Sequence, residues 1–268
     1  MKSLKNLPFF FFALALSCGG SKKNETNTSL KVGVIAGPEF ELARTAKKVA
    51  KEKYNLEVEL VSFNDYVMPN ESLNIGDIEV NIFQNIPYLE DQSKKRGYKF
   101  AVLGKTFTYP IVGYSKKIKS PTELKEGNTI AIANDPTNGG RALLLLQKNG
   151  LLTLKKNIGL FPKLTDIVEN PKNLNIIEIE APQLPRVLDD KSVVIAVINN
   201  SFASQNGLEI EKDGVIIEDK ESPYVNIVVS REDNKNDERI KNFVKAYQSD
   251  EVEKTAKKIF NGGAIKGW

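Results

Sequence analysis

The sequence predicts an α/β fold of two lobes with a ligand cleft between them. Short apolar segments typical of strands alternate with segments of helical periodicity, which indicates largely parallel sheets covered by helices. Two extended runs, Thr106–Ser115 and Glu218–Ser230, separate the middle of this pattern from its ends. The chain has 268 residues, of which 41% are hydrophobic and 27% charged. That composition is globular, and the length is sufficient for two cores.

The predicted first lobe opens with a strand at Leu30–Ile35, a short apolar run of strand type. Ala36-Gly37-Pro38 turns the chain. Phe40–Tyr54 has apolar residues at helical spacing, and Asn55 ends that helix. The same reasoning predicts the other elements of this lobe: a strand at Leu56–Phe63, a short helix at Asn70–Leu73, a strand at Ile78–Phe83, a helix from Gln84 to Arg96 and a strand at Phe100–Leu103.

The predicted second lobe opens with a strand, a turn and a helix at Ile130–Gly150. Pro136 stops the strand because proline cannot donate to a sheet ladder, and Thr137 or Asn138 can cap the helix. We expect one crossing strand at Thr106–Ser115 to lead into this lobe. The later elements are a loop-rich stretch at 157–173, strands at 175–179 and 193–198, short helices at 182–188 and 199–205, a returning strand at 224–230, and final helices at 237–247 and 250–260.

The first residues have the layout of a secretory signal. Met1–Asn6 is short and basic, Leu7–Leu16 is apolar, and small residues surround Cys18. The apolar stretch is too short to span a membrane. A cysteine directly after it is typical of a bacterial lipoprotein signal, although Leu16 lies one position nearer the cysteine than usual. We therefore predict that Cys18 carries a lipid, palmitate included; the alternative is a plain secretory signal with an incidental cysteine.

These features divide the chain into four parts. Residues 1–17 are the predicted signal peptide, and residues 18–29 are a polar, flexible tether. Residues 30–112 and 226–268 form lobe one, and residues 113–225 form lobe two. Ligands of α/β lobes bind at the carboxyl ends of the strands, so two such edges that face each other make a cleft.

Several kinds of chemistry are excluded by composition. Histidine is absent and Cys18 is the only cysteine, which removes the commonest general base, any histidine triad and any intrachain disulfide. The carboxylates show no metal-ligand spacing, and Gly139-Gly140 lacks the lysine-serine ending of a phosphate-binding loop. The net charge is +4 with the two signs interspersed. We expect no metal, no cofactor and no nucleic-acid partner.

The helix that begins after Ile130–Ala133 offers a candidate anion site. Gly139 and Gly140 leave bare backbone near its start, and Arg141 adds a guanidinium. A helix start exposes unpaired N–H groups and the positive end of the dipole. Together they suit a small anion, most simply a carboxylate. The alternative is a capped helix whose arginine is solvated.

Other polar and aromatic side chains follow the predicted strands. An arginine fork suits a carboxylate, asparagine oxygens can accept from an ammonium, and aromatic rings suit an alkyl or thioether chain. The set therefore predicts a cleft for a zwitterion with an apolar side chain. The alternatives are core aromatics and capping or turn asparagines. Besides Arg141, the candidates are Tyr66, Phe83, Asn85, Tyr88, Asn199 and Asn226, with Tyr109 on the crossing strand.

A specific set of motifs extends over the chain from about Leu30 to Trp268. They are VSFNDY at 61–66, FQNIPY at 83–88, TYPI at 108–111, NDPTNGGR at 134–141, EAPQLP at 180–185, AVIN at 196–199, DKESPYVN at 219–226 and FNGGAIKGW at 260–268. Through these motifs the chain closely resembles the methionine-binding lipoproteins of bacterial ABC importers, the MetQ/NlpA family.

The resemblance implies a periplasmic-binding-protein fold that closes on free methionine and docks to a membrane permease driven by an ATPase subunit. It implies that Arg141 holds the ligand carboxylate and that Asn199 and Asn226 bind the amino-acid head. Tyr66, Phe83 and Tyr88 would line the side-chain pocket (the remaining candidate, Asn85, stands where the family usually has histidine). An amide can donate a hydrogen bond, but it is shorter and carries no charge, so ligand strength or preference is expected to differ.

The resulting hypothesis is a lipid-anchored envelope protein, facing the periplasm or the exterior, that captures L-methionine or a close relative and delivers it to an ABC importer. One alternative is a surface lipoprotein with an interaction or adhesion role and a vestigial cleft. The other is an enzyme, against which the missing histidine and the unpaired carboxylates argue.

Overall fold

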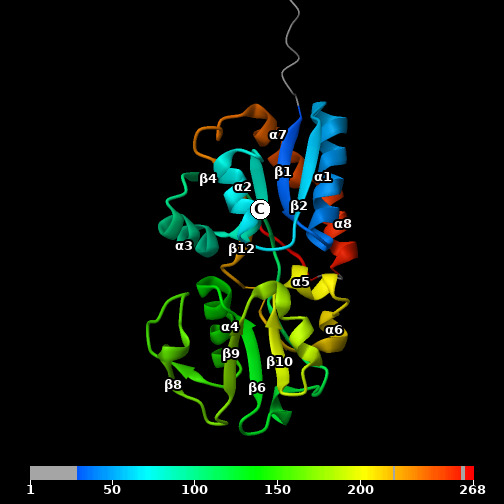
Figure 1. Cartoon of the computed structure of the whole chain (residues 1–268). Helices are drawn as coiled ribbons and strands as arrows, with labels where there is room; N and C mark the ends of the chain where they lie inside the picture. Colours follow the sequence, from blue (N-terminus) through cyan, green and yellow to red (C-terminus); the bar gives the residue numbers. More distant parts are fainter. Residues whose placement is uncertain (1–28, 220, 261–262) are drawn as a thin grey trace, which may run out of the picture.

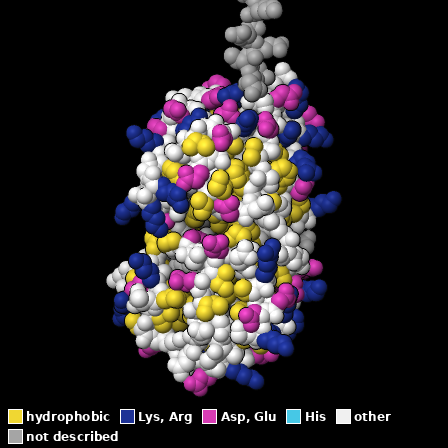
Figure 2. Space-filling view, viewed as in Figure 1, with side chains coloured by type: hydrophobic (Ala, Val, Ile, Leu, Met, Phe, Trp, Pro, Cys, Tyr) yellow, Lys and Arg dark blue, Asp and Glu magenta, His cyan; other side chains and the backbone are white. Residues whose placement is uncertain are grey.

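The computed structural model of the chain describes residues 29–219, 221–260 and 263–268. The predicted signal peptide, Cys18 and the predicted tether up to residue 28 lie outside the described residues. Within these ranges no helix is long and apolar enough to cross a membrane. On the face drawn in Figure 2, basic and acidic side chains are interspersed and do not gather by sign.

Lobe one is built on a six-stranded sheet in the order β13–β4–β12–β3–β1–β2 (Figure 1). β1 (Leu30–Ile35) lies between two parallel neighbours, β2 (Val58–Phe63) and β3 (Val80–Asn85). The pairings of the other three strands are antiparallel, because the returning strand inserts between β3 and β4 and runs opposite to both. These strands are β4 (Phe100–Thr108), β12 (Val225–Arg231) and β13 (Ile265–Lys266).

The helices of lobe one cover both faces of this sheet. α1 (Pro38–Tyr54) buries Leu42, Ala46 and Val49 at helical spacing and ends at Asn55, whose φ is 49°. Asparagine tolerates this left-handed conformation better than most residues do. α1 packs beside the two last helices, and Figure 1 shows α2 and α3 on the other side of the lobe. The bounds are α2 Met68–Ile75, α3 Ile86–Arg96, α7 Glu238–Tyr247 and α8 Asp250–Ile259.

Lobe two is built on a five-stranded sheet in the order β11–β5–β10–β6–β9. Its centre is parallel and apolar, as expected for strands buried on both faces. The strands are β5 (Val112–Tyr114), β6 (Thr129–Ala133), β9 (Asn175–Ile179), β10 (Val193–Ile198) and β11 (Gly214–Ile217). The helices are α4 (Pro136–Lys148), α5 (Asn200–Gln205) and α6 (Ile210–Asp213). The predicted two-lobed α/β fold is confirmed.

Two local predictions were wrong. The expected single crossing strand at Thr106–Ser115 is two strands in different sheets, because the chain leaves the ladder around Pro110, which has no N–H. The stretch at 157–173 is loop-rich, as expected, with one short strand, β8 (Ile167–Glu169), which pairs with β7 (Thr153–Leu154). The expected short helix at 182–188 is two 3-10 turns.

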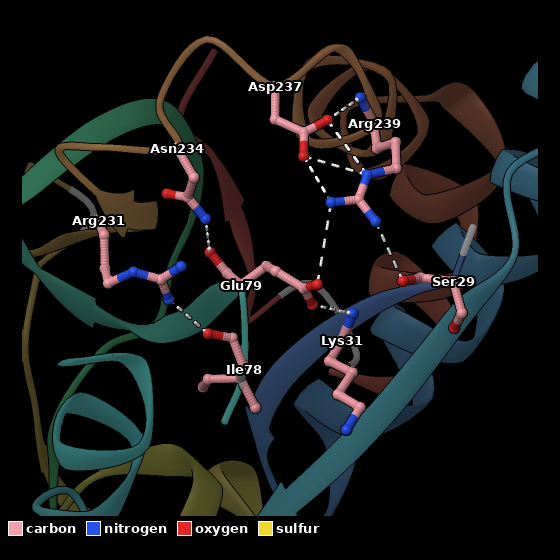
Figure 3. A network of polar contacts seen from close by, with 8 residues as sticks. All are labelled: Ser29, Lys31, Ile78, Glu79, Arg231, Asn234, Asp237 and Arg239. Carbon is pink, nitrogen blue, oxygen red and sulfur yellow. Dashed lines mark hydrogen bonds and ion pairs between the residues drawn. The ribbon is translucent and has the colours of Figure 1, made fainter. Parts of the chain in front are cut away.

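A polar cluster holds the described start of the chain at the pole of lobe one that is remote from lobe two (Figures 1 and 3). The Glu79 carboxylate accepts from the Lys31 backbone N–H at 2.7 Å and lies 3.8 Å from the Arg239 guanidinium. Arg239 also donates to the Ser29 carbonyl at 3.3 Å and pairs with Asp237, which caps α7. The amino end of β1 is thereby fixed to β3 and α7.

Candidate functional site

All seven predicted site residues line one cavity between the lobes. The cavity lies at the carboxyl ends of β1, β3, β6 and β10, where ligands of α/β lobes bind. An apolar cluster that joins Phe83 and Tyr88 of lobe one to Phe202 of lobe two closes part of its wall. The lining residues are Glu39, Tyr66, Phe83, Gln84, Asn85, Tyr88, Tyr109, Asn138, Arg141, Asn199, Asn200, Ser201 and Asn226.

Three aromatic rings from lobe one form a slot at one side of the cavity. The Tyr66 ring stacks on Phe83 with 5.9 Å between centroids, and Tyr88 meets both rings edge-on. The Tyr88 hydroxyl donates to the Tyr66 carbonyl at 2.9 Å, which fixes the loop after β2. Burial raises the pKa of both tyrosines, so their hydroxyls stay neutral. Such a slot suits an alkyl or thioether chain.

Asn85 links the aromatic slot to the helix behind it. It is the N-cap of α3, and its Oδ1 accepts from the Tyr88 backbone N–H at 3.0 Å. The capping role that sequence left open for this residue is therefore present. Because Oδ1 is engaged and the residue lines the cavity, Nδ2 is the group with which Asn85 can serve a ligand.

The start of α4 differs from the sequence prediction. The cap is Asp135, not Thr137 or Asn138, and its carboxylate accepts from the Asn138 backbone N–H at 2.9 Å. Gly139 and Gly140 are required for close packing: a Cβ would lie 2.6 Å from the Ala133 carbonyl oxygen and 2.9 Å from that of Leu160. The Gly139 N–H also donates to the Asp135 carbonyl at 2.8 Å, so the expectation of free glycine backbone for an anion was wrong, and the arginine is the group that remains available.

Arg141 is buried at 4% exposure, so the alternative of a solvated arginine was also wrong. Its Nε donates to Glu218 Oε1 at 2.8 Å, and its Nη2 donates to the Tyr109 carbonyl at 2.9 Å and to Glu218 Oε2. The guanidinium carbon lies 4.3 Å from the centre of the Tyr224 ring. Nη1 has no hydrogen-bond partner among the described residues, which leaves one edge of the fork for a ligand anion.

Glu218 ties this arginine to both crossings between the lobes. Its backbone N–H donates to the Ile111 carbonyl at 3.1 Å, and its Oε2 accepts from the Ile111 N–H at 3.3 Å. Arg141 on α4 is therefore held by the hinge itself.

Two asparagines contribute amide groups from opposite lobes. Asn199 Nδ2 donates to Asn138 Oδ1 at 2.8 Å, while its own Oδ1 is buried with no partner in the described parts of the chain. That orphaned acceptor suits a ligand N–H. Asn226, on β12, donates through Nδ2 to the Glu39 carboxylate at 3.4 Å.

Glu39 is a cavity residue that the sequence prediction missed. It lies in the first turn of α1, is 4% exposed, and accepts from the Ser201 hydroxyl of lobe two. Burial raises the pKa of Glu39 to about 7, partly offset by the hydrogen bonds from Ser201 and Asn226. A signal was present: Glu39 follows the carboxyl end of the first strand, the position from which the other candidates were collected.

Contacts across the cleft hold the lobes together on the side of α1. Besides the Ser201–Glu39 bond, Gln205 Nε2 donates to the Ala36 carbonyl at 2.7 Å. Among residues 29–219, 221–260 and 263–268, no group of three or more acidic or cysteine side chains could hold a metal ion. The cavity therefore offers one cation, amides, a carboxyl group and aromatic rings.

Comparisons with known proteins agree with this geometry. The D-methionine-binding lipoprotein MetQ of Salmonella typhimurium is 62% identical over 96% of this chain and 94% of its own length. A periplasmic substrate-binding protein of an ABC transporter from Coxiella burnetii superposes with a TM-score of 0.86 at 47% identity, over 89% of this chain and all of that one. A nutrient-binding protein from Burkholderia cenocepacia, solved bound to methionine, gives 0.86 at 46% identity with the same coverage.

The family model described as NlpA lipoprotein matches residues 30–268, which is the whole described body of the molecule apart from Ser29. Together with the relatives' identities over nearly the full length, this match shows that the chain belongs to the NlpA lipoprotein family.

Proposed function

We propose that this protein captures methionine in the cleft between its lobes and delivers it to the permease and ATPase subunits of a membrane ABC importer. The observation that carries the proposal is the single cavity that joins a hinge-held arginine, an orphaned amide oxygen and an aromatic slot. The names of the relatives, one of them solved with methionine, point to the same ligand. No covalent step is involved.

In this proposal different cavity residues bind the carboxylate, the amino group and the side chain of methionine. Arg141 Nη1 holds the carboxylate, Asn199 and Asn226 bind the amino-acid head, and the slot of Tyr66, Phe83 and Tyr88 takes the side chain. Ligand contacts with both lobes favour the closed state over the open one by their differential free energy. Since Arg141 is bonded to both crossings, carboxylate binding also acts directly on the hinge.

The proposal includes attachment to the cell envelope through a lipid on Cys18, facing the periplasm or the exterior. The NlpA lipoprotein match supports it. Lobe one would comprise residues 30–112 and 226–268, and lobe two residues 113–225.

Methionine is expected to raise the melting temperature of the ligand-free protein. A ligand present at a hundred times its dissociation constant adds about 2.7 kcal/mol, which shifts a protein of this size by roughly 5–10 °C. The measurement is thermal denaturation of refolded, ligand-free protein with L-methionine and D-methionine, and with leucine and lysine as controls. A shift with neither methionine enantiomer would contradict the proposal and favour the interaction or adhesion role.

Asn85→Asp is expected to weaken methionine binding about tenfold without destabilising the fold. A carboxylate keeps the cap on Tyr88 and suits a helix start, but it removes the Nδ2 donor and adds a negative charge to the cavity. Calorimetric titration and urea denaturation measure the two effects. Asn85→Ala, as the matched variant, should lose both the cap, at about 1 kcal/mol, and the donor. Unchanged affinity in Asn85→Asp would limit Asn85 to capping.

A further inference from the structure

Glu39 is a buried carboxyl group that lines the ligand cavity and has no role in the binding of methionine as described above. It faces the cavity from the first turn of α1, at the carboxyl end of β1, and it touches both lobes through Asn226 and Ser201. Its hydrogen bonds come from an amide and a hydroxyl, and in the described ranges it has no ion pair with a lysine or arginine. A buried carboxylate without a cation is costly unless one arrives.

The positive charge of Arg141, the cationic side chain of the cavity lining, is already matched. Its ion pair is with Glu218, and in the described ranges it makes none with Glu39, which therefore has no cationic partner of its own. A zwitterionic ligand brings one negative and one positive group. Arg141 Nη1 suits the first, and the only cavity-lining group that can carry a negative charge for the second is Glu39.

We propose that Glu39 is the acceptor for the ammonium group of the bound amino acid, and that the side chain ionises as the ligand enters and releases a proton to solvent. This inference rests on the proposed function. The carboxyl proton leaves as solvent H⁺, the ligand ammonium keeps its three protons, and the complex contains a desolvated ammonium–carboxylate pair. Ser201 and Asn226 each hold one carboxylate oxygen, and the remaining lone pairs accept from the ammonium.

The other titratable groups near Glu39 are not expected to change protonation when the ligand binds, so the released proton can be assigned to Glu39. The tyrosines that face it, Tyr66, Tyr109 and Tyr247, have pKa values raised by burial and stay neutral near pH 7. Across the cleft, the pKa of Asp135 is also raised by burial, but this carboxylate caps α4 and accepts from Asn138. Burial raises the pKa of Glu39 to about 7, so both the protonated and the ionised form are populated near neutral pH.

Calorimetric titration of the full chain with L-methionine, in buffers of different ionisation enthalpy, tests the proposal. The heat should vary with the buffer, with about half a proton released at pH 7 and nearly one at pH 6. Affinity should be about tenfold lower at pH 6 than at pH 8, since the proton must leave before the pair forms.

The variant Glu39→Gln should lose the buffer dependence and the pH dependence and bind methionine about tenfold to a hundredfold more weakly. Glu41→Gln is the matched control, because Glu41 lies in the same turn of α1 and pairs with Arg44 at the surface. It should behave as the parent protein does. The probe 4-(methylsulfanyl)butanoate, which lacks the ammonium, should bind Glu39→Gln at least as well as the parent.

The outcomes separate the two proposals. If neither methionine enantiomer binds the parent protein, the proposed function fails. If methionine binds without proton release, and Glu39→Gln keeps the parent affinity, only the role of Glu39 is overturned. If the ammonium-free probe shows the same pH dependence as methionine, Glu39 acts on lobe closure through Ser201, and the ammonium assignment is wrong.

Discussion

Arg141→Ala is expected to lower the association constant for methionine by about tenfold to a hundredfold. The variant removes the cation of the cavity lining, and a charge-assisted hydrogen bond contributes about 1.5–3 kcal/mol. It also leaves the carboxylate of Glu218, which is only 14% exposed, without its ion-pair partner. Breaking a buried pair from one side costs about 3–5 kcal/mol, so the fold should be destabilised as well. Calorimetric titration and urea denaturation measure the two losses.

The double variant Arg141→Ala/Glu218→Gln is the control that separates binding from stability. Glutamine can still accept from the Ile111 N–H but no longer leaves a buried charge unpaired. Much of the lost stability should return, while methionine binding stays as weak as in Arg141→Ala. Near-parent affinity in either variant would mean that Arg141 serves the hinge alone and that another group holds the ligand carboxylate.

At pH 8, ligand-free Glu39→Gln is expected to have a free energy of unfolding about 3 kcal/mol higher than that of the parent protein. At pH 4.5 the two proteins should be about equally stable. The pKa of Glu39 is about 7 in the folded protein against an ordinary 4.5. The folded state therefore binds more protons, and the parent loses stability as the pH rises from about 4.5 to about 7. The variant has no charge to bury, so it should lack this loss.

Urea denaturation of ligand-free protein at several pH values measures this difference, with Glu41→Gln again as the control. The comparison of parent with Glu39→Gln isolates one carboxyl group, because Asp135 contributes to both proteins equally. Parallel stability curves for the parent and Glu39→Gln would show that Glu39 is not buried in its charged form. If Glu39→Gln is more stable than the parent and also binds methionine poorly, then Glu39 destabilises the fold but is needed for ligand binding.

Local patterns in the sequence were sufficient for the fold class and for the seven predicted residues that line the cavity, but not for Glu39. β10 was predicted at its exact bounds because an uninterrupted apolar run of six residues, Val193–Ile198, has few alternatives. The lobe boundaries near residues 112 and 225 remain a prediction; β5 and β12 begin at Val112 and Val225. The roles of the seven site residues likewise remain predictions, although the cavity contains them all.

The side-chain contacts within the site could not be predicted from the sequence, because the partners are distant along the chain. Arg141 meets a carboxylate 77 positions away, and Glu39 meets a hydroxyl 162 positions away. Neither pairing leaves a local pattern. Gly139 and Gly140 were misinterpreted for the same reason, since the atoms that exclude a side chain there belong to Ala133 and Leu160. The contacts of these residues depend on which distant segments the fold brings together, and residue type alone does not predict them.

The polar cluster around Glu79 has a mechanical consequence for an anchored molecule. A pull on the chain at Ser29 acts along β1, and β1 is bonded on both sides to parallel strands, so the load is shared by many hydrogen bonds at once. Lobe two lies outside this sheet and is joined to lobe one by the crossings and by the Ser201–Glu39 and Gln205–Ala36 contacts. If the lipid is on Cys18, a force from the anchor therefore reaches lobe one first, through β1, and lobe two only by way of lobe one.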